Sequence, residues 1–292
     1  MESKYILELK GIKQEYINQS NQSFQVLNDI NVKIKEGEFV TIVGPTGCGK
    51  STLLRMILGS EKPSQGKVLM EGREITKPDR DRGVVFQKYS LFDNLTVREN
   101  IRIGLELENC TLWQNLLNSV FSGSRLEQFN EQVDQYLKKV NLVEHADKFP
   151  HELSGGMRQR VAIAQAMIMK PKVLLMDEPF GALDAGTKEQ MHDFMFEQWK
   201  ETGQTILFVT HDLEEAIYLG TRVIVLSQYY KGAKGSKIVK DLDNNWTNLG
   251  GAEIKDDVQF LSLVKTIRNE GLNSNNLLDH KNFELTHQDH IL

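Results

Sequence analysis

The chain is poor in cysteine and in long apolar runs. Of its 292 residues only Cys48 and Cys110 are cysteines, which argues against a disulfide framework and for a reducing compartment. No apolar run approaches the ~18 residues that a membrane-spanning helix needs, and the N-terminus MESKYILELK lacks the apolar core of a signal peptide. We therefore expect a cytosolic protein, which a partner must hold if it works at a membrane.

A surplus of positive charge is also missing. The net charge is −5, which gives no support to a nucleic-acid-binding surface, so we expect no nucleic acid among its partners. Hydrophobic residues make up 40 % of the chain, as in ordinary globular proteins. The length suits one large α/β domain, or one domain with appendages.

Short apolar runs alternate with helical patterns along most of the chain. FVTIV at 39–43 is continuously apolar, as a strand buried on both faces is. VLLM at 173–176, TILFVT at 205–210 and RVIVLS at 222–227 read as further strands, and the segments between them read as helices. Strands that alternate with helices predict an α/β fold with parallel strands at the centre of its sheet.

The middle of the chain changes to a helical pattern. TVRE at 96–99 fits a capping box, the segment 104–139 is mostly helical with a Gly-Ser break, and one helical face carries Met157, Val161, Ala164 and Ile168. We expect a mostly helical subdomain at about residues 88–170.

The pattern weakens beyond Ser227. QYYKGAKGSK looks like a loop, one amphipathic helix is expected with Val258, Leu261, Val264 and Ile267 on its apolar face, and the end of the chain is polar. The predicted organisation is a domain over 1–228 and a C-terminal extension over 229–292, with one helix and a polar tail that we expect to be poorly ordered.

VGPTGCGKST follows the buried run FVTIV directly and leads into a helix. Glycines let a backbone wrap a phosphate, and successive N–H groups together with the helix dipole then form an anion nest. The pattern predicts a P-loop in which Lys50 reaches the β- and γ-phosphates and the Ser51 hydroxyl ligates Mg²⁺. Cys48 is expected to be a small filler, and a reactive thiol is the alternative. The predicted nucleotide-binding residues are Gly44, Pro45, Thr46, Gly47, Cys48, Gly49, Lys50, Ser51 and Thr52.

Two acids follow the buried run VLLM. Ligands of open α/β sheets bind at the carboxyl ends of the strands, so Asp177 is predicted to hold Mg²⁺ and Glu178 to act as the general base on water. A solvated strand end is the alternative when the pair is considered alone.

LSGGM at 153–157 predicts a second phosphate-binding helix start. Ser154 can cap the helix, and Gly155 and Gly156 leave its first N–H groups bare. An ordinary Ser-Gly cap is the alternative. A chain with one nucleotide seldom needs two such starts, unless one of them serves a nucleotide held by another subunit.

The stretch LSGGMRQRVAIAQAMIMKPKVLLMDEPFGALD resembles the signature, Walker B and D-loop block of ATP-binding-cassette (ABC) ATPases. The resemblance extends from about residue 5 to about residue 228. It implies an α/β P-loop NTPase of ABC type, with a RecA-like mixed sheet core, an antiparallel β subdomain and a helical signature subdomain. It also implies ATP hydrolysis, with ATP and Mg²⁺ as cofactors.

Several roles rest on this resemblance. It implies that Ser154, Gly155 and Gly156 contact the γ-phosphate of ATP on the opposite protomer of a head-to-tail dimer. Gln87 matches the Q-loop glutamine that senses Mg²⁺ and the γ-phosphate, and His211 matches the switch histidine. With Lys50 and Glu178, these two complete the predicted catalytic set.

Two further positions follow from the same resemblance. Asp184 matches the D-loop and is expected among the nucleotide-binding residues. Tyr16 is the best match for the aromatic residue that stacks on adenine. Phe24 is its rival, because NQSNQSF stretches the spacing between Tyr16 and the P-loop.

PDRDRGVVFQKYSLFDNLTVRENI and THDLEEAIYLGTRVIVLS resemble the nitrate/sulfonate/taurine class of importer ATPases. This implies transmembrane permease subunits, indirectly a substrate-binding protein, and a place on the cytoplasmic face of the cell membrane. The permease is expected in a groove around Gln87, Tyr89 and Phe92. The ATPase of an exporter or lipid-transport complex is the alternative, and a non-transport ABC protein fits poorly. The segment 104–131 is longer than usual for the class, and 228–248 also differs.

Overall fold

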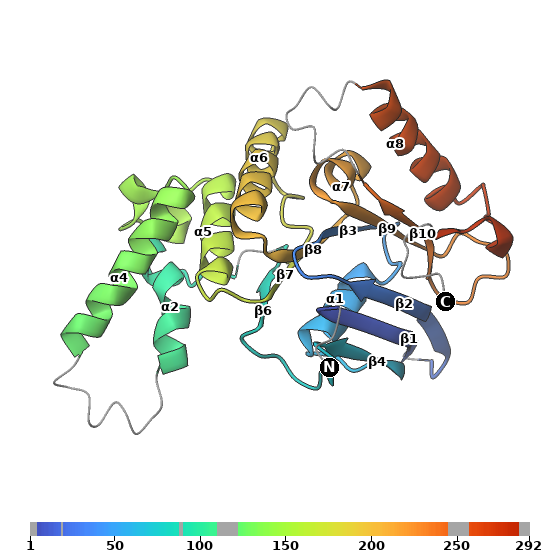
Figure 1. The fold of residues 1–292 in the computed structure, drawn as a ribbon, viewed down its shortest axis with the longest axis horizontal. Helices are drawn as coiled ribbons and strands as arrows, with labels where there is room; N and C mark the ends of the chain where they lie inside the picture. The colour runs from blue at the N-terminus through green and yellow to red at the C-terminus, as the bar shows by residue number, and fades with distance from the viewer. Residues whose placement is uncertain (1–4, 19, 88–89, 110–121, 245–256, 286–292) are drawn as a thin grey trace.

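Two sheets organise the chain in the computed structural model, which describes residues 5–18, 20–87, 90–109, 122–244 and 257–285 (Figure 1). The larger sheet has the strand order β11-β10-β9-β3-β8-β7-β6 and is parallel from β9 to β6, while β10 runs antiparallel to β9. Its strands are β3 (Phe39–Val43), β6 (Arg82–Val85), β7 (Val173–Asp177), β8 (Thr205–Thr210), β9 (Arg222–Ser227), β10 (Lys237–Asp243) and β11 (Glu284–Leu285).

The smaller sheet is antiparallel and has the order β2-β1-β4-β5. Its strands are β1 (Leu7–Ile17), β2 (Ser23–Ile34), β4 (Gln65–Met70) and β5 (Arg73–Glu74). The helices are α1 (Lys50–Leu58), α2 (Val97–Asn109), α4 (Ser122–Lys139), α5 (Gly155–Met167), α6 (Ala185–Thr202), α7 (Leu213–Leu219) and α8 (Val258–Gly271), and the short 3-10 turns are η1 (Val143–His145), η2 (Pro150–Glu152) and η5 (His280–Asn282). Figure 1 shows α2 and α4 at the end of the molecule that lies farthest from the smaller sheet.

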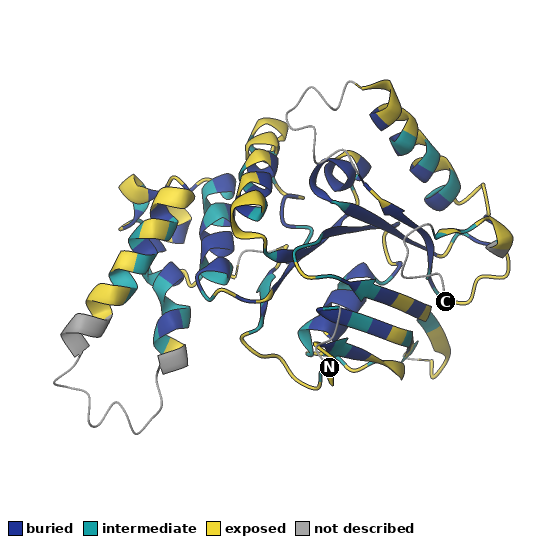
Figure 2. Cartoon of the chain, viewed as in Figure 1, coloured by how far each residue is buried: buried dark blue, intermediate teal, exposed yellow. Residues whose placement is uncertain are grey.

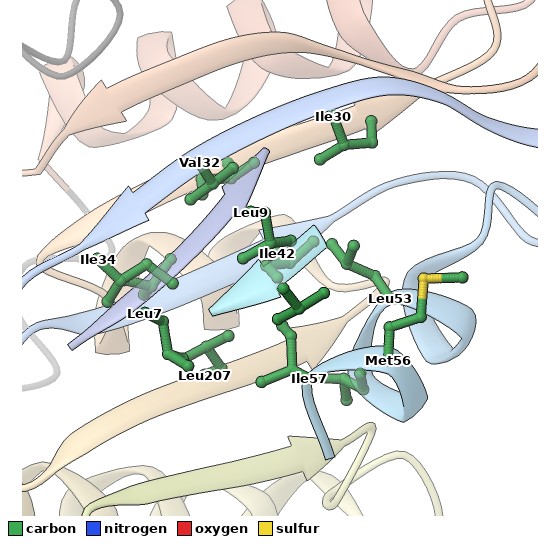
Figure 3. Close-up of a cluster of buried hydrophobic side chains, with 14 of the residues drawn as sticks. Leu7, Leu9, Ile30, Val32, Ile34, Ile42, Leu53, Met56, Ile57 and Leu207 are labelled. Carbon is green, nitrogen blue, oxygen red and sulfur yellow. The ribbon is translucent and has the colours of Figure 1, made fainter. Parts of the chain in front are cut away.

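The larger sheet is covered on both faces, as its continuously apolar strands require. Side chains of a strand point alternately to opposite faces, and Val40 and Ile42 of β3 pack with α1 and the smaller sheet. Figure 3 shows Ile42 beside Leu53 and Ile57 of α1. Phe39 instead packs with α5, α6 and α7, and α8 covers the part of this second face formed by β9 and β10. The sheet is therefore held rigidly between two layers.

This arrangement brings three chain segments to one edge of the sheet. β3, β7 and β8 are parallel neighbours, so the loops that follow Val43, Asp177 and Thr210 leave from the same edge. The predicted P-loop, Glu178 and the switch histidine lie on these loops, and Asp177 is the last residue of β7.

Helices α2, α4 and α5 lie in the region where the sequence predicts a helical subdomain, and the bounds of that subdomain stay a prediction. Thr96 and Glu99 form the capping box, because each side chain accepts a hydrogen bond from the other residue's backbone N–H. Val161, Ala164 and Ile168 are buried together, with Met157 packed against them. The Gly-Ser sequence lies at the start of α4 rather than in a break between helices, and residues 110–121 of the long segment lie outside the described residues.

The C-terminal extension differs from the prediction in two ways. Strands β10 and β11 continue the larger sheet, although the sequence indicated only a loop, one helix and a polar tail beyond residue 228. The apolar face of α8 is also shifted, because Phe260 is buried while Val258 and Leu261 are exposed. Figure 2 shows this division of α8 into a buried and an exposed side. The domain boundary at residue 228 stays a prediction.

A buried ion pair ties β10 into the sheet, and it yields a stability prediction. Arg222 is 1 % exposed and donates from Nε and Nη2 to the two carboxylate oxygens of Asp241, at 2.7 Å each. Asp241→Asn would leave the guanidinium without its main counter-charge, so we expect unfolding to require roughly 3–5 kcal/mol less. Urea denaturation measures this. The exposed Lys67–Glu74 pair supplies the control: Glu74→Gln should cost less than about 1 kcal/mol, and equal losses in both variants would contradict the prediction.

Candidate active site

The loop between β3 and α1 is shaped to receive an anion. Gly47 and Gly49 have φ of +80° and +97°, a backbone conformation that strongly favours glycine. Gly44 lies so close to Leu226 that a Cβ on Gly44 would meet the Leu226 carbonyl oxygen at 2.2 Å. α1 starts without a side-chain cap, so its first N–H groups are left to a ligand.

Lys50 lies across this loop. Its Nζ donates to the carbonyl oxygens of Gly44 at 2.8 Å and Pro45 at 3.2 Å, and the residue is 6 % exposed. Cys48 is fully buried in the core beneath, and burial raises the pKa of its thiol, which agrees with a filler and not with a reactive nucleophile. The loop therefore holds one ammonium group at its centre, where phosphate oxygens would meet it.

The acid pair lies beside the start of α1. The Ser51 hydroxyl donates to Asp177 Oδ1 at 3.1 Å. Burial raises the pKa of the Asp177 carboxyl against the opposing effect of this hydrogen bond, and the charge of Glu178 adds to the increase. A cation placed here would relieve that penalty. The oxygens of Ser51, Asp177 and Gln87 are the hard ligands that Mg²⁺ prefers, so the residues fit the predicted metal.

Two of the other predicted catalytic residues, Gln87 and His211, lie close to Glu178. Its Oε2 lies 3.4 Å from Gln87 Nε2 and 3.2 Å from His211 Nδ1. Its φ is +45°, a conformation that costs a non-glycine residue about 1–3 kcal/mol and is concentrated at functional sites. The Glu178 N–H donates to the Val209 carbonyl at 2.9 Å, which holds the carboxylate at the edge of the sheet.

An open cleft of about 620 Å³ joins these groups, a size within the range of small-ligand sites. Its lining comes from both sheets and α1: Tyr16, Phe24, Val26, Thr46, Gly47, Gly49, Lys50, Ser51, Thr52, Gln87, Asp177, Glu178 and His211.

Both candidate aromatic residues lie at one side of this cleft. The Tyr16 and Phe24 rings are 5.9 Å apart and tilted by 38°. The Tyr16 hydroxyl donates to Glu61, whereas Phe24 is 49 % exposed. Which of them stacks on a base stays a prediction. Val26 was missed from the sequence, although its position two residues after Phe24 on the same strand face could have indicated it.

The second predicted phosphate site is not part of this cleft in the described residues. Ser154 caps α5 by accepting from the Met157 N–H at 3.3 Å, and Asp184 caps α6 by accepting from the Thr187 N–H at 3.0 Å. Neither residue lines the cleft, and nor do Gly155 and Gly156. That Ser154, Gly155 and Gly156 contact a nucleotide held by a second copy stays a prediction. Tyr89 of the expected permease groove lies outside the described residues, and Phe92 is 47 % exposed.

Comparisons with known proteins agree on a family. Residues 27–181 match the model of the ABC transporter family. The nitrate import ATP-binding protein NrtD of Synechocystis sp. is 45 % identical over 221 residues, which are 76 % of this chain and 77 % of that protein. The aliphatic sulfonates import ATP-binding protein SsuB of Bacillus cereus is 40 % identical over 79 % of this chain and 83 % of its own.

Solved structures give the same result. A dimeric ATP-binding cassette in a post-hydrolysis state, bound to ADP and Pi, superposes with a TM-score of 0.67 at 32 % identity, covering 82 % of this chain and 99 % of that one. CbiO1 of Clostridium perfringens, part of the ABC transporter complex CbiONQ, covers 91 % of this chain and 95 % of its own with a TM-score of 0.67 at 26 % identity.

Fold and site together define a P-loop ATPase built as an ATP-binding cassette. The chain belongs to the ABC transporter family. Across the part of the chain that the structure describes, none of the helices combines the length and apolar character that crossing a bilayer takes.

Proposed function

We propose that this chain energises an ABC importer for a small anionic or nitrogen- or sulfur-containing solute by hydrolysing MgATP as one half of a head-to-tail dimer. The observation that carries this is the convergence of Gln87 and His211 on Glu178, beside Lys50 and the Ser51–Asp177 pair. Relatives named for nitrate and sulfonate import support the solute class.

Each group in the cleft has a task that its position allows. Lys50 and the loop N–H groups bind the phosphates, and Ser51, Gln87 and Asp177 hold Mg²⁺, which neutralises charge on the transferred phosphate when bound. Glu178 accepts the proton of the attacking water. His211 contacts the γ-phosphate and is oriented by Glu178.

A second copy completes the site. Ser154, Gly155 and Gly156 of one protomer meet the γ-phosphate held by the other, so this contact exists with ATP and is lost after hydrolysis. A ligand shifts an equilibrium only by its differential affinity for two states, and this contact supplies the difference between open and closed dimers. Closure then moves the permease subunits bound near Gln87 and Phe92 at the cytoplasmic face of the membrane.

Isolation of the whole complex tests this proposal. The tagged chain should copurify with a polytopic permease, and a solute-loaded binding protein added to the reconstituted complex should raise its ATPase rate. Nitrate and an aliphatic sulfonate are the solutes to compare, with an unrelated sugar as the control. Copurification with an efflux or lipid-transfer component would contradict the importer assignment. Stimulation by the sugar alone would contradict the solute class.

A further inference from the structure

A buried polar cluster lies directly beneath the loop that carries His211. Glu215 of α7 is its centre and is 3 % exposed. Its Oε1 lies 2.8 Å from His192 Nε2 of α6, and its Oε2 accepts a hydrogen bond from the hydroxyl of Thr210, the residue that precedes His211. Ionisable side chains are rarely buried unless they are paired. The Glu215 carboxylate meets this condition, because each of its two oxygens has a partner.

The residue that follows His211 is held by the same cluster. The Asp212 N–H donates to Thr210 Oγ1 at 3.0 Å, so a hydrogen bond joins the two residues that flank His211. Asp212 Oδ2 pairs with Lys188 Nζ of α6 at 2.7 Å, and this Nζ also lies 3.6 Å from Glu215. Burial alone would raise the pKa of Asp212, but the hydrogen bond and charge of Lys188 hold it below its ordinary value. The backbone on both sides of His211 is therefore anchored to α6.

His192 shows how closely this cluster is packed. Its ring lies 5.7 Å from the Phe180 ring and 5.8 Å from the Tyr218 ring. Its Nδ1 is buried without a hydrogen-bond partner among the described residues. The tautomer with a proton on Nε2 suits this environment, because it donates to Glu215 and leaves only a lone pair unmatched at Nδ1.

The first turn of α6 also supports the groups expected to serve the partner's nucleotide. Asp184 caps this turn through the Thr187 N–H. A Cβ on Gly156 would meet Thr187 Cγ2 at 2.3 Å, so the start of α5 rests on the same residue. Lys188 is the next residue along the helix. The chain thus contains a continuous packed path from Gly156 through Thr187 and Lys188 to the loop of His211.

We propose that Lys188, His192 and Glu215 are positioning residues that couple the two nucleotides of the dimer through one chain. The contact of Ser154 and Gly156 with the partner's nucleotide displaces the start of α5 and the first turn of α6 that packs against it. The cluster passes that displacement to His211 and its 3.2 Å contact with Glu178. This inference rests on the proposed dimer. It assigns to the cluster a role in cooperativity, which burial and stability alone do not require.

Lys188 offers the sharpest test, because two substitutions separate its charge from its size. Lys188→Met should lower kcat roughly 10- to 100-fold, as expected when a catalytic group is misplaced by about 1 Å. The affinity for ATP should stay within about twofold, because Lys188 does not line the cleft. The Hill coefficient for ATP should fall toward 1, since the linkage between the two sites is lost. Lys188→Arg, which keeps the charge, should restore kcat and cooperativity.

Glu215→Gln tests the centre of the cluster in the same assays. Its matched control is Glu214→Gln, the exposed neighbour whose backbone N–H, like that of Glu215, donates to Asp212. The first variant should lose kcat and cooperativity, and the control should retain both. Thermal unfolding is measured alongside, so that a variant that fails to fold is recognised.

The outcomes separate the two hypotheses. Unchanged cooperativity in folded Lys188→Met and Glu215→Gln would overturn the coupling role, and so would a loss of rate that Lys188→Arg does not restore. A native protein that neither hydrolyses ATP nor dimerises with it would instead overturn the proposed function.

Discussion

Glu178→Gln is expected to bind ATP as tightly as the native chain and to hydrolyse it roughly 10²- to 10⁴-fold more slowly, the usual contribution of a general base. Glutamine keeps the size of the side chain and can still interact with Gln87 and His211, but it cannot accept the proton of water. Because the γ-phosphate then persists, the closed dimer should accumulate.

The choice of glutamine matters because of the backbone at this position. Glu178 has φ of +45°, and its N–H and carbonyl are fixed to Val209 and Gly181. A glycine at position 178 would relieve the backbone strain, and both glycine and alanine would remove the contacts to Gln87 and His211. Either substitution would therefore change more than the proton transfer. Glutamine carries the same backbone cost and isolates the proton transfer.

Two measurements check this prediction. Single-turnover hydrolysis reports the rate, and light scattering with MgATP reports the dimer, with exposed Glu74→Gln as the control. The prediction fails if Glu178→Gln turns over normally, or if ATP leaves it as monomer while the affinity for ATP is unchanged.

The parts of the fold that the sequence predicts are those with local signals. β3, β8 and β9 are apolar runs with the expected bounds, and β7 extends its predicted run by one residue, to Asp177. The P-loop combines glycine spacing with a strand before it and a helix after it. These features depend on neighbouring residues along the chain, so the pattern is sufficient to find them.

β10 was missed because its signal is not local. Lys240 and Asp241 interrupt its apolar pattern, yet both are buried. Lys240 pairs with Glu270 and Glu284, and Asp241 pairs with Arg222. Buried charges of this kind are recognised only when their partners are known, and these partners lie 19 to 44 residues away.

The register of α8 shows a second limit. Spacing by three residues suggested Val258, Leu261, Val264 and Ile267, whereas the buried residues are Phe260, Val264, Ile267 and Gly271. A helix has 3.6 residues per turn, so a stripe spaced only by three drifts away from the buried face. Within the site, Gln87 and His211 rested on family resemblance, and only the fold brings them to Glu178.

Lys50→Ala should abolish hydrolysis. The Lys50 ammonium donates to the P-loop carbonyls of Gly44 and Pro45, and removing such a donor from developing charge costs at least ~10²-fold in rate. Ser154→Arg should abolish hydrolysis for another reason, since a bulky cation at the start of α5 blocks closure on the partner's phosphate. Lys50→Ala should lose nucleotide affinity, whereas Ser154→Arg should keep it.

Mixing these two inactive variants tests whether the site is shared. In a head-to-tail heterodimer both defects fall on one nucleotide site, and the other site has an intact P-loop and an intact Ser154. The mixture should therefore regain hydrolysis and trap nucleotide at one site per heterodimer, while each variant alone does neither. If each chain instead used its own Ser154, every site in the mixture would carry one defect and no activity would return. Refolding the two variants together ensures exchange of protomers, and native chain treated in the same way controls for losses.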